Sequence, residues 1–167
     1  WRDVECARLG TERILALAER TGRPVHILHV STAEELDLLR QHRRLATVEL
    51  LVNHLTQWAP EVYERLGGYA VMNPPLRDRR HTEAAWAAVA YGVVVEGNRH
   101  KFAAGPERDY LIGTGADVLV EASPVDLIWG SGRGEEPSDL LPSRWTGRNL
   151  LGFALMDVRD ELAPPGR

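Results

Sequence analysis

The stretch Trp86-Ala-Ala-Val-Ala-Tyr-Gly-Val-Val-Val-Glu-Gly-Asn98 joins two parts of the chain that have different sequence patterns. Before it, short apolar runs alternate with amphipathic segments. After it, glycine, aspartate and tryptophan interrupt a more polar sequence that ends in one amphipathic segment. The stretch lacks the Pro, Gly and Ser content of a linker. It predicts a single helix over about Thr82–Ala104, with Gly92 and Gly97 as its weakest points.

The composition is typical of a globular protein: 44% of the 167 residues are hydrophobic and 26% are charged. A net charge of -4 with scattered arginines argues against a nucleic-acid partner. No apolar run approaches the roughly 20 residues of a membrane-spanning helix. The lone Cys6 excludes an internal disulfide, so we expect a cytoplasmic protein. The start at Trp1 inside a helical pattern suggests a piece of a longer sequence, and Pro164–Gly166 is expected to fray.

Residues 1–92 show the pattern of an α/β fold. Apolar runs at Val25–Val30, Ala46–Val52 and Tyr69–Met72 predict three short buried strands. Helical patterns lie before, between and after these runs, over residues 3–20, 31–42, 59–66 and 80–89. About three βα units with short loops predict a parallel sheet with right-handed crossovers.

His29, His54 and Asn73 each lie at or just after the end of a predicted strand. Ligands of parallel α/β folds bind at this edge, and neutral imidazoles from successive strands can converge on one metal. For each histidine alone, a hydrogen-bonded polar residue at a strand end is an equally good interpretation. The other histidines are interpreted as structural (His26) or solvent-facing (His42, His81 and His100).

Three motifs of this part resemble the dihydroorotase and cyclic amidohydrolase family: Pro24–Leu36, Val48–Thr56 and Met72–Arg77. The resemblance implies a segment of a TIM-type barrel, with His29 and His54 as ligands of a two-zinc centre and Asn73 as a substrate contact. That family also needs a His-x-His pair, a bridging lysine or acid, and a late aspartate, and these have no counterpart here. No cofactor is therefore certain, and zinc would have an incomplete ligand set, because a catalytic zinc usually has three protein ligands.

Beyond the joint, the sequence predicts a helix-rich α+β segment. Helical patterns cover residues 107–111 and 153–162, and Val118–Ala122 has the pattern of a short strand. Between them lie two glycines, Gly130 and Gly132, that allow a backbone to approach a ligand closely.

Three polar or aromatic residues of this segment are candidate ligand contacts. Trp129 offers a flat face for a planar ring, and Asn149 can both donate and accept hydrogen bonds. Asp126 is a candidate general base, or a partner for ribose hydroxyls. The structural alternative is that the tryptophan lies in the core and the nearby glycines form turns.

Four motifs of this segment resemble the carboxy-terminal half of the NADAR (YbiA-like) family: Lys101–Phe102, Gly113–Gly115, Leu119–Gly132 and Trp145–Arg159. The resemblance implies hydrolysis of N-glycosidic bonds in phosphoribosylaminopyrimidines or in ADP-ribose-modified groups. The oxocarbenium-like transition state of that reaction would use a carboxylate and an aromatic wall. Trp86, fifteen residues before Lys101, matches the family's pocket tryptophan, so the resemblance implies a catalytic role for it. The family's glutamate-histidine-aromatic motif has no counterpart here.

We therefore expect an amidohydrolase-like part over residues 1–92 and a NADAR-like part over 86–167, joined within 86–98. Three functions stay open. The chain could be an N-glycosidase-type hydrolase or binding module for a small nucleotide or ribosyl ligand. It could be a zinc-dependent cyclic amide hydrolase, or a fused chain with neither activity. Partial folds expose apolar surface, so the chain is expected to aggregate, dimerise or pack its halves together.

Overall fold

A computed structural model describes residues 2–163, so the expected fraying of Pro164–Gly166 lies outside the described residues. The chain divides into two compact units, Trp1–Val89 (unit 1) and Ala90–Arg167 (unit 2). The boundary falls inside helix α5, Arg79–Lys101, which is the helix predicted over the joint. Gly92 and Gly97 do not interrupt it.

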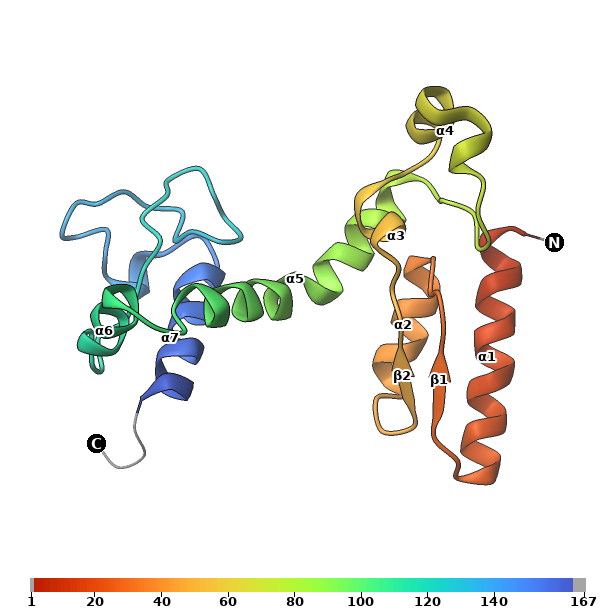
Figure 1. Cartoon of the computed structure of the whole chain (residues 1–167), viewed down its shortest axis with the longest axis horizontal. Helices are drawn as coiled ribbons and strands as arrows, with labels where there is room; N and C mark the ends of the chain where they lie inside the picture. Colours follow the sequence, from red (N-terminus) through yellow and green to blue (C-terminus); the bar gives the residue numbers. More distant parts are fainter. Residues whose placement is uncertain (1, 164–167) are drawn as a thin grey trace. The chain divides into compact units, whose positions relative to one another are not determined.

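Unit 1 alternates helices with two short strands (Figure 1). In chain order its elements before α5 are α1 (Val4–Thr21), β1 (Val25–Ile27), α2 (Ala33–Gln41), β2 (Ala46–Val48), α3 (Val52–Thr56), α4 (Glu61–Leu66) and the 3₁₀ helix η1 (Gly67–Ala70).

Local signals in the sequence explain where the helices of unit 1 begin and end. The Asp3 carboxylate accepts a hydrogen bond from the Cys6 N–H at 2.7 Å and caps α1. Gly22, at a φ of 66°, ends that helix in the left-handed conformation. Thr32 and Glu35 form a capping box at the start of α2.

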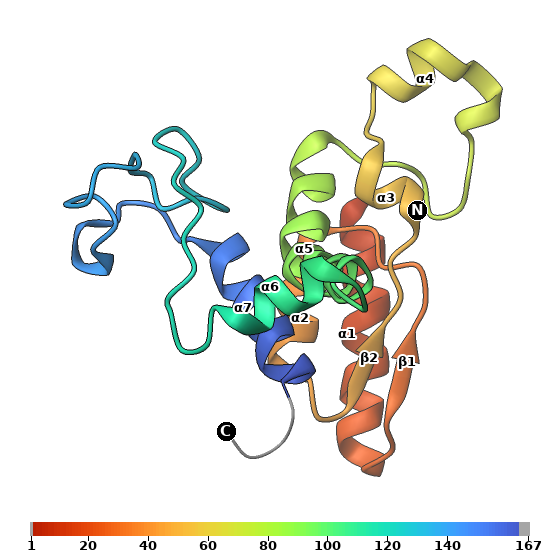
Figure 2. The same ribbon diagram turned by 60° about the vertical axis from the view of Figure 1, so that its left-hand side comes forward.

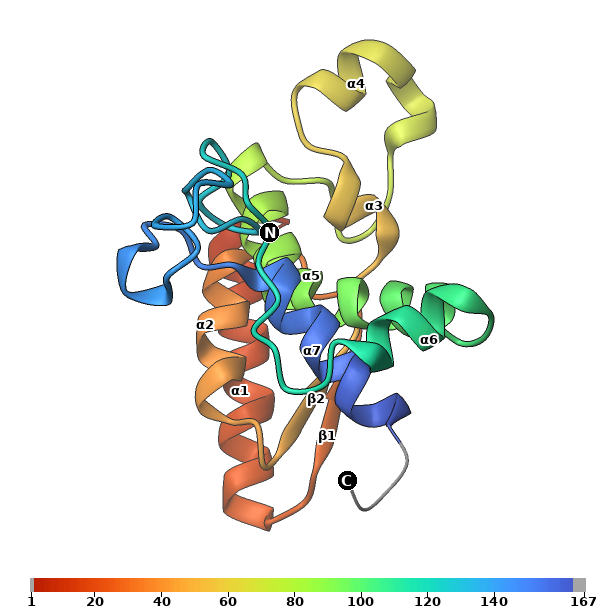
Figure 3. The ribbon, with the colours of Figure 1, turned by 90° about the vertical axis from the view of Figure 1, so that its left-hand side faces the viewer.

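The two strands of unit 1 pair in parallel, with Val25 opposite Ala46 and Ile27 opposite Val48. Helix α1 packs along β1 and α2 along β2, and the two helices contact each other (Figure 3). The core between these elements is made of aliphatic side chains: Leu15, Val30, Leu36, Leu39, Ala46 and Ala85.

The third strand predicted at Tyr69–Met72 does not form. Residues 67–70 are a 3₁₀ helix instead, and the sheet has two strands among residues 2–163, so three βα units of a barrel are not shown. A local cluster competes with the sheet, because Ala70 is buried against Val62 and Leu76. The Ala59 N–H also donates to the Arg77 carbonyl at 2.7 Å and closes residues 60–77 into a loop.

Unit 2 contains the second part of α5, helix α6 (Pro106–Gly113), a 3₁₀ turn η2 (Pro142–Arg144) and helix α7 (Leu150–Leu162). Residues 114–149, apart from η2, form a long irregular segment (Figure 2). The strand predicted at Val118–Ala122 is therefore absent, and that stretch is extended backbone held by side chains. The prediction of a helix-rich segment is correct, and the predicted strand is wrong for the described residues of unit 2.

Polar contacts join α5 to α7 inside unit 2. The Tyr91 hydroxyl donates to the Asp157 carboxylate at 2.6 Å. Partial burial and this carboxylate together raise the pKa of Tyr91 to about 12. Arg99 forms a two-pronged pair with Glu161 at 2.8 and 2.9 Å. No helix among residues 2–163 is both long enough and apolar enough to cross a membrane.

Candidate functional site

Four of the site residues predicted in unit 2, Asp126, Trp129, Gly130 and Gly132, lie in one turn, Asp126–Gly132. Asp126 Oδ1 accepts hydrogen bonds from the N–H groups of Ile128 at 2.9 Å and Trp129 at 2.8 Å. These backbone donors, Trp129 first, lower the pKa of Asp126. The carboxylate is therefore ionised at neutral pH and fixes the backbone that carries the indole ring.

The Asp126–Gly132 turn is hydrogen-bonded to the start of α7. The carbonyls of Ile128 and Trp129 accept hydrogen bonds from Leu150 and Leu151 at 3.2 and 3.1 Å. The carbonyl of Gly130 accepts from the Asn149 N–H at 2.9 Å. The carbonyls of the turn therefore satisfy N–H groups that have no partner within the helix itself.

Asn149 holds the irregular segment against this turn. Its side chain has 0% exposure, its Oδ1 accepts from the Glu121 N–H at 2.9 Å, and its Nδ2 donates to the Leu119 carbonyl at 2.9 Å. Its backbone has a φ of 50°, which asparagine tolerates better than most residues. The ligand contact predicted for Asn149 stays a prediction, and its present contacts are those of a positioning residue.

Gly130 and Gly132 allow close approach, but the approaching backbone belongs to the chain itself. A Cβ on Gly130 would lie 2.8 Å from the Asp126 carbonyl oxygen, and one on Gly132 would lie 2.8 Å from the Gly147 nitrogen. Gly132 also has a φ of 69°. The structural interpretation of these glycines as turn residues therefore has direct support, and their contact with a ligand stays a prediction.

The predicted site residues divide between the two units. Asp126, Trp129, Gly130, Gly132 and Asn149 are neighbours in unit 2, where the Trp129 side chain is half-buried. The remaining predicted residues belong to unit 1: His29, His54, Asn73 and Trp86. Trp86 lies on α5 and is 41% exposed, so its ring is accessible, and its predicted catalytic role is untested.

The two candidate metal ligands of unit 1 have different surroundings. His29 has a φ of 57°, and its Nε2 lies 3.1 Å from a Glu49 carboxylate oxygen. His54 is 4% exposed, and neither of its ring nitrogens has a hydrogen-bond partner. Burial lowers the pKa of His54 more than the nearby backbone of Pro74 and Pro75 raises it, and the charge of Arg77 lowers it further, so its ring is neutral at pH 7.

This pair does not fit a catalytic zinc centre. Among residues 2–163, no group of three or more His, Cys, Asp or Glu side chains could hold a metal ion. A catalytic zinc takes three protein ligands, and a dinuclear centre takes more. The zinc centre implied by the amidohydrolase resemblance therefore lacks its third ligand within the described part of the chain.

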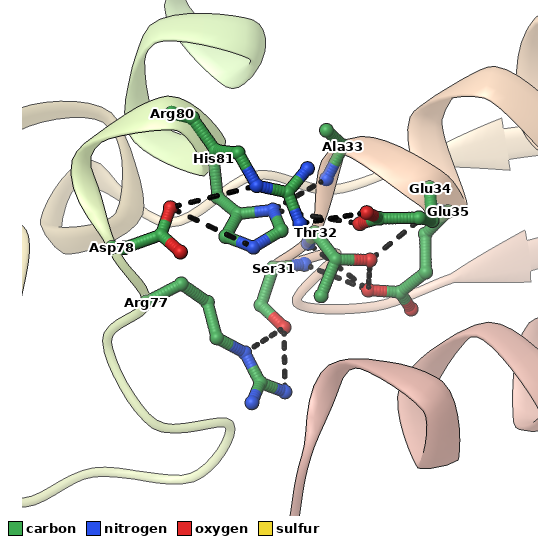
Figure 4. Close-up of polar contacts among 9 residues, drawn as sticks. All are labelled: Ser31, Thr32, Ala33, Glu34, Glu35, Arg77, Asp78, Arg80 and His81. Atoms are coloured by element: carbon green, nitrogen blue, oxygen red, sulfur yellow. Dashed lines mark hydrogen bonds and ion pairs between the residues drawn. The ribbon is translucent and has the colours of Figure 1, made fainter.

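A polar cluster anchors the loop that carries Asn73 (Figure 4). Arg77, which follows in the same loop, donates to the Ser31 hydroxyl at 3.4 Å. Arg80 of α5 forms an ion pair with Glu34 of α2 at 2.7 Å. Asn73 itself is exposed, so its side chain is accessible, and its predicted substrate contact is untested.

His81 belongs to this cluster and corrects the prediction that it faces solvent. It is 2% exposed, and its Nδ1 accepts the Ala33 N–H at 3.0 Å, at the first turn of α2. Burial, reinforced by the positive charge of Arg80, lowers the pKa of His81. The prediction failed because the polar sequence around His81 also fits a buried contact between two helices.

We expect unit 1 to lose stability on mild acidification. His54 and His81 have lowered pKa values when folded, so below about pH 6.5 the unfolded chain binds more protons than the folded chain. The carboxylates with lowered pKa values, Glu5, Glu34, Asp126 and Glu161, change the stability only in more acid solution. The melting temperature, followed by circular dichroism, should fall between about pH 7.5 and about pH 5.5.

Asparagine at position 81 provides the matched comparison for this experiment, because its oxygen can accept the Ala33 N–H without titrating. His81→Asn should therefore melt with a weaker pH dependence than the wild type. A wild-type melting temperature that rises or stays constant over this interval would contradict the prediction.

Comparison with known proteins gives one family match and several partial relatives. The NADAR domain family model matches residues 20–163. N-glycosidase R617 of Acanthamoeba polyphaga mimivirus is 40% identical over 87 residues, which are 51% of this chain and 51% of that protein. Allantoinase of Streptomyces avermitilis is 26% identical over 162 residues, 94% of this chain and 32% of that protein.

A dihydroorotase of Geobacillus thermodenitrificans is 33% identical over 92 residues, 53% of this chain and 21% of that protein. The chain therefore spans about half the length of the N-glycosidase and a third or less of the other two relatives.

Proposed function

Because this chain belongs to the NADAR domain family, we propose that it binds a ribosyl ligand through residues 86–167 and contributes to hydrolysis of an N-glycosidic bond. The similarity to an N-glycosidase supports the reaction class. The observation that carries the proposal is the Asp126–Gly132 turn, which holds an ionised carboxylate and the backbone of Trp129 in a fixed relation.

The proposed role of Asp126 is electrostatic. In this reaction the bond between the ribose C1′ and the nitrogen breaks, and positive charge develops on the sugar ring. Water then adds its oxygen to C1′, and the proton that the water loses passes to the departing nitrogen. A carboxylate with a lowered pKa is a weak base, but it stays negatively charged at neutral pH. Asp126 is therefore better suited to stabilise the positive charge on the sugar than to remove a proton from water.

The proposed role of Trp129 is to stack on a planar ring of the ligand. Stacking of a base on an aromatic side chain is worth about 1–3 kcal/mol. The Trp129 backbone has its N–H bonded to Asp126 and its carbonyl bonded to Leu151. The ring therefore projects from a backbone that needs little ordering when the ligand binds.

We expect ADP-ribose to raise the melting temperature of the full chain by about 3–6 °C at a tenfold excess over its Kd. Trp129→Ala should abolish this shift, while Tyr110→Ala, a change at an exposed aromatic residue of α6, should leave it intact. The measurement is differential scanning fluorimetry with ADP-ribose, and ribose 5-phosphate in parallel separates recognition of the adenine ring from recognition of the sugar phosphate.

Asp126→Asn separates charge from structure in the same experiment. Asparagine keeps an oxygen for the N–H groups of Ile128 and Trp129, so the turn should persist without its negative charge. Binding should remain while any release of base or amine from an N-glycoside falls. No thermal shift at millimolar ADP-ribose or ribose 5-phosphate would refute ribosyl binding and favour a chain with neither activity.

The second candidate is a zinc-dependent cyclic amide hydrolase, favoured by His29, which follows β1, by His54 in helix α3 and by the dihydroorotase similarity. Because the third ligand is missing among residues 2–163, we expect elemental analysis of the purified chain to find far less than one zinc per chain. His54→Leu should leave this value unchanged. Stoichiometric zinc that is lost in His29→Ala or His54→Leu would support the second candidate instead.

A further inference from the structure

The outer edge of β2 in unit 1 has no partner strand among residues 2–163. The sheet consists of β1 and β2 among residues 2–163, and β2 meets β1 through the backbone of Leu45, Thr47 and Glu49. Backbone groups alternate in direction along a strand, so the carbonyls of Ala46 and Val48 face the other edge. An unpaired edge is a template for an added strand.

A groove of about 550 Å³ runs along this unpaired edge. Helix α2 contributes Leu36 and Leu39 to it, and α5 contributes Ala87 and Ala88. Two positively charged side chains, Arg40 and Arg43, complete its lining. The groove therefore offers apolar surface, open backbone acceptors and positive charge side by side, which fits an extended apolar segment with acidic neighbours.

The chain itself contains a segment with these properties, Tyr69–Met72. Tyr69 and Val71 are 98% and 67% exposed, whereas Ala70 is buried and Met72 is half-buried. This alternation is the pattern of a strand with one unpartnered face, and tyrosine and valine favour strands. Two acidic residues of the preceding helix α4, Glu61 and Glu64, are also exposed.

The segment is placed to reach a second molecule. It lies in the loop formed by residues 60–77, whose ends are held together by the hydrogen bond between Ala59 and Arg77. Within unit 1, this loop projects away from β2 in the ribbon, carrying α4 and η1 (Figure 1). Its exposed side chains therefore have no partner strand in their own unit.

We propose that the chain forms a reciprocal dimer in which Tyr69–Met72 of each copy lies along the β2 edge of the other. Tyr69 and Val71 enter the groove between α2 and α5, and the acidic residues of α4 meet Arg40 and Arg43. The exchange uses the same two surfaces on both copies, so it closes with twofold symmetry. Binding opens the hydrogen bond from the Val71 N–H to the Gly68 carbonyl and unwinds the end of η1, which includes Tyr69 and Ala70.

Sedimentation velocity of the full chain tests the proposal, at concentrations from about 5 μM to about 200 μM, where small interfaces associate. We expect the wild type to shift from monomer to dimer over this range. Val71→Lys should weaken the dimer at least tenfold without harming the monomer, because Val71 is exposed. Val52→Lys, at a 71% exposed valine of α3, is the matched control and should behave like the wild type.

Two further variants examine the groove. Ala88→Trp, at an exposed position of α5, should fill the groove and weaken the dimer as strongly as Val71→Lys. Arg43→Glu should weaken it by reversing a charge of the groove, and adding Glu64→Arg should restore it. A chain that is monomeric at the highest concentration would overturn the proposal. A dimer that survives either Val71→Lys or Ala88→Trp would overturn it as well.

Discussion

Replacing Asn149 by alanine is expected to destabilise unit 2 by about 3 kcal/mol or more. The substitution leaves the Glu121 N–H and the Leu119 carbonyl without the partners they have now. It also places alanine at a φ of 50°, which costs about 1 kcal/mol because its Cβ meets the backbone. The measurement is the free energy of unfolding from urea titration, followed by tryptophan fluorescence.

Glycine at the same position separates the two causes. Asn149→Gly removes both hydrogen bonds but accepts a positive φ freely, so it should be about 1 kcal/mol more stable than Asn149→Ala. Asn53→Ala, at an exposed asparagine of α3, is the control and should change stability by less than about 0.5 kcal/mol. If Asn149→Ala is as stable as the wild type, the two hydrogen bonds from the Asn149 side chain to residues 119 and 121 contribute nothing to the free energy of unfolding.

Gly147→Ala is expected to cost about 2–4 kcal/mol, because the added methyl group has no space. A Cβ at this position would collide with the Gly130 carbonyl oxygen and lie 2.8 Å from both the Gly132 nitrogen and the Ser131 carbonyl carbon. These are backbone atoms and cannot rotate away. Gly147 is held against residues 130–132 by the Ser131 carbonyl, which accepts hydrogen bonds from the N–H groups of Thr146 at 3.0 Å and Gly147 at 2.8 Å.

Gly97→Ala provides the matched control with the opposite sign. Gly97 lies within α5, and a Cβ there would meet nothing within 4 Å. Alanine favours a helix over glycine, so this substitution should stabilise the chain by about 0.5–1 kcal/mol. Urea titration of both variants measures their free energies of unfolding. A Gly147→Ala protein as stable as the wild type would mean that the backbone of residues 130–132 can shift to make room for the methyl group.

How much could be predicted from sequence differs between the elements. The helix across the joint was predictable because residues 79–101 hold no proline and a continuous helical composition. The strands at Val25 and Ala46 were predictable because their apolar runs lie between clear helix ends. The strand at Tyr69–Met72 was not, since its alternating pattern is real but Ala70 packs with the local cluster of Val62 and Leu76.

The sequence predicted candidate residues for a site, and their ligand contacts stay predictions. In the structure Asp126, Trp129 and Asn149 lie around the start of α7. Their motifs could not show that the Asn149 amide bonds backbone twenty-eight and thirty residues away, since that depends on how the irregular segment folds. The positive φ of Asn149 was not predicted either, although asparagine is one of the few residues that tolerate it.

The sharing of α5 between the units has a consequence for how the molecule unfolds. Ala85 belongs to the core of unit 1, whereas Ala90, only five residues later, is buried in unit 2. Loss of either core removes the packing from one end of a helix whose other end stays folded. Amide hydrogens near the boundary then remain protected from exchange until the more stable unit opens, so the slowest exchange in α5 reports the stability of that unit alone.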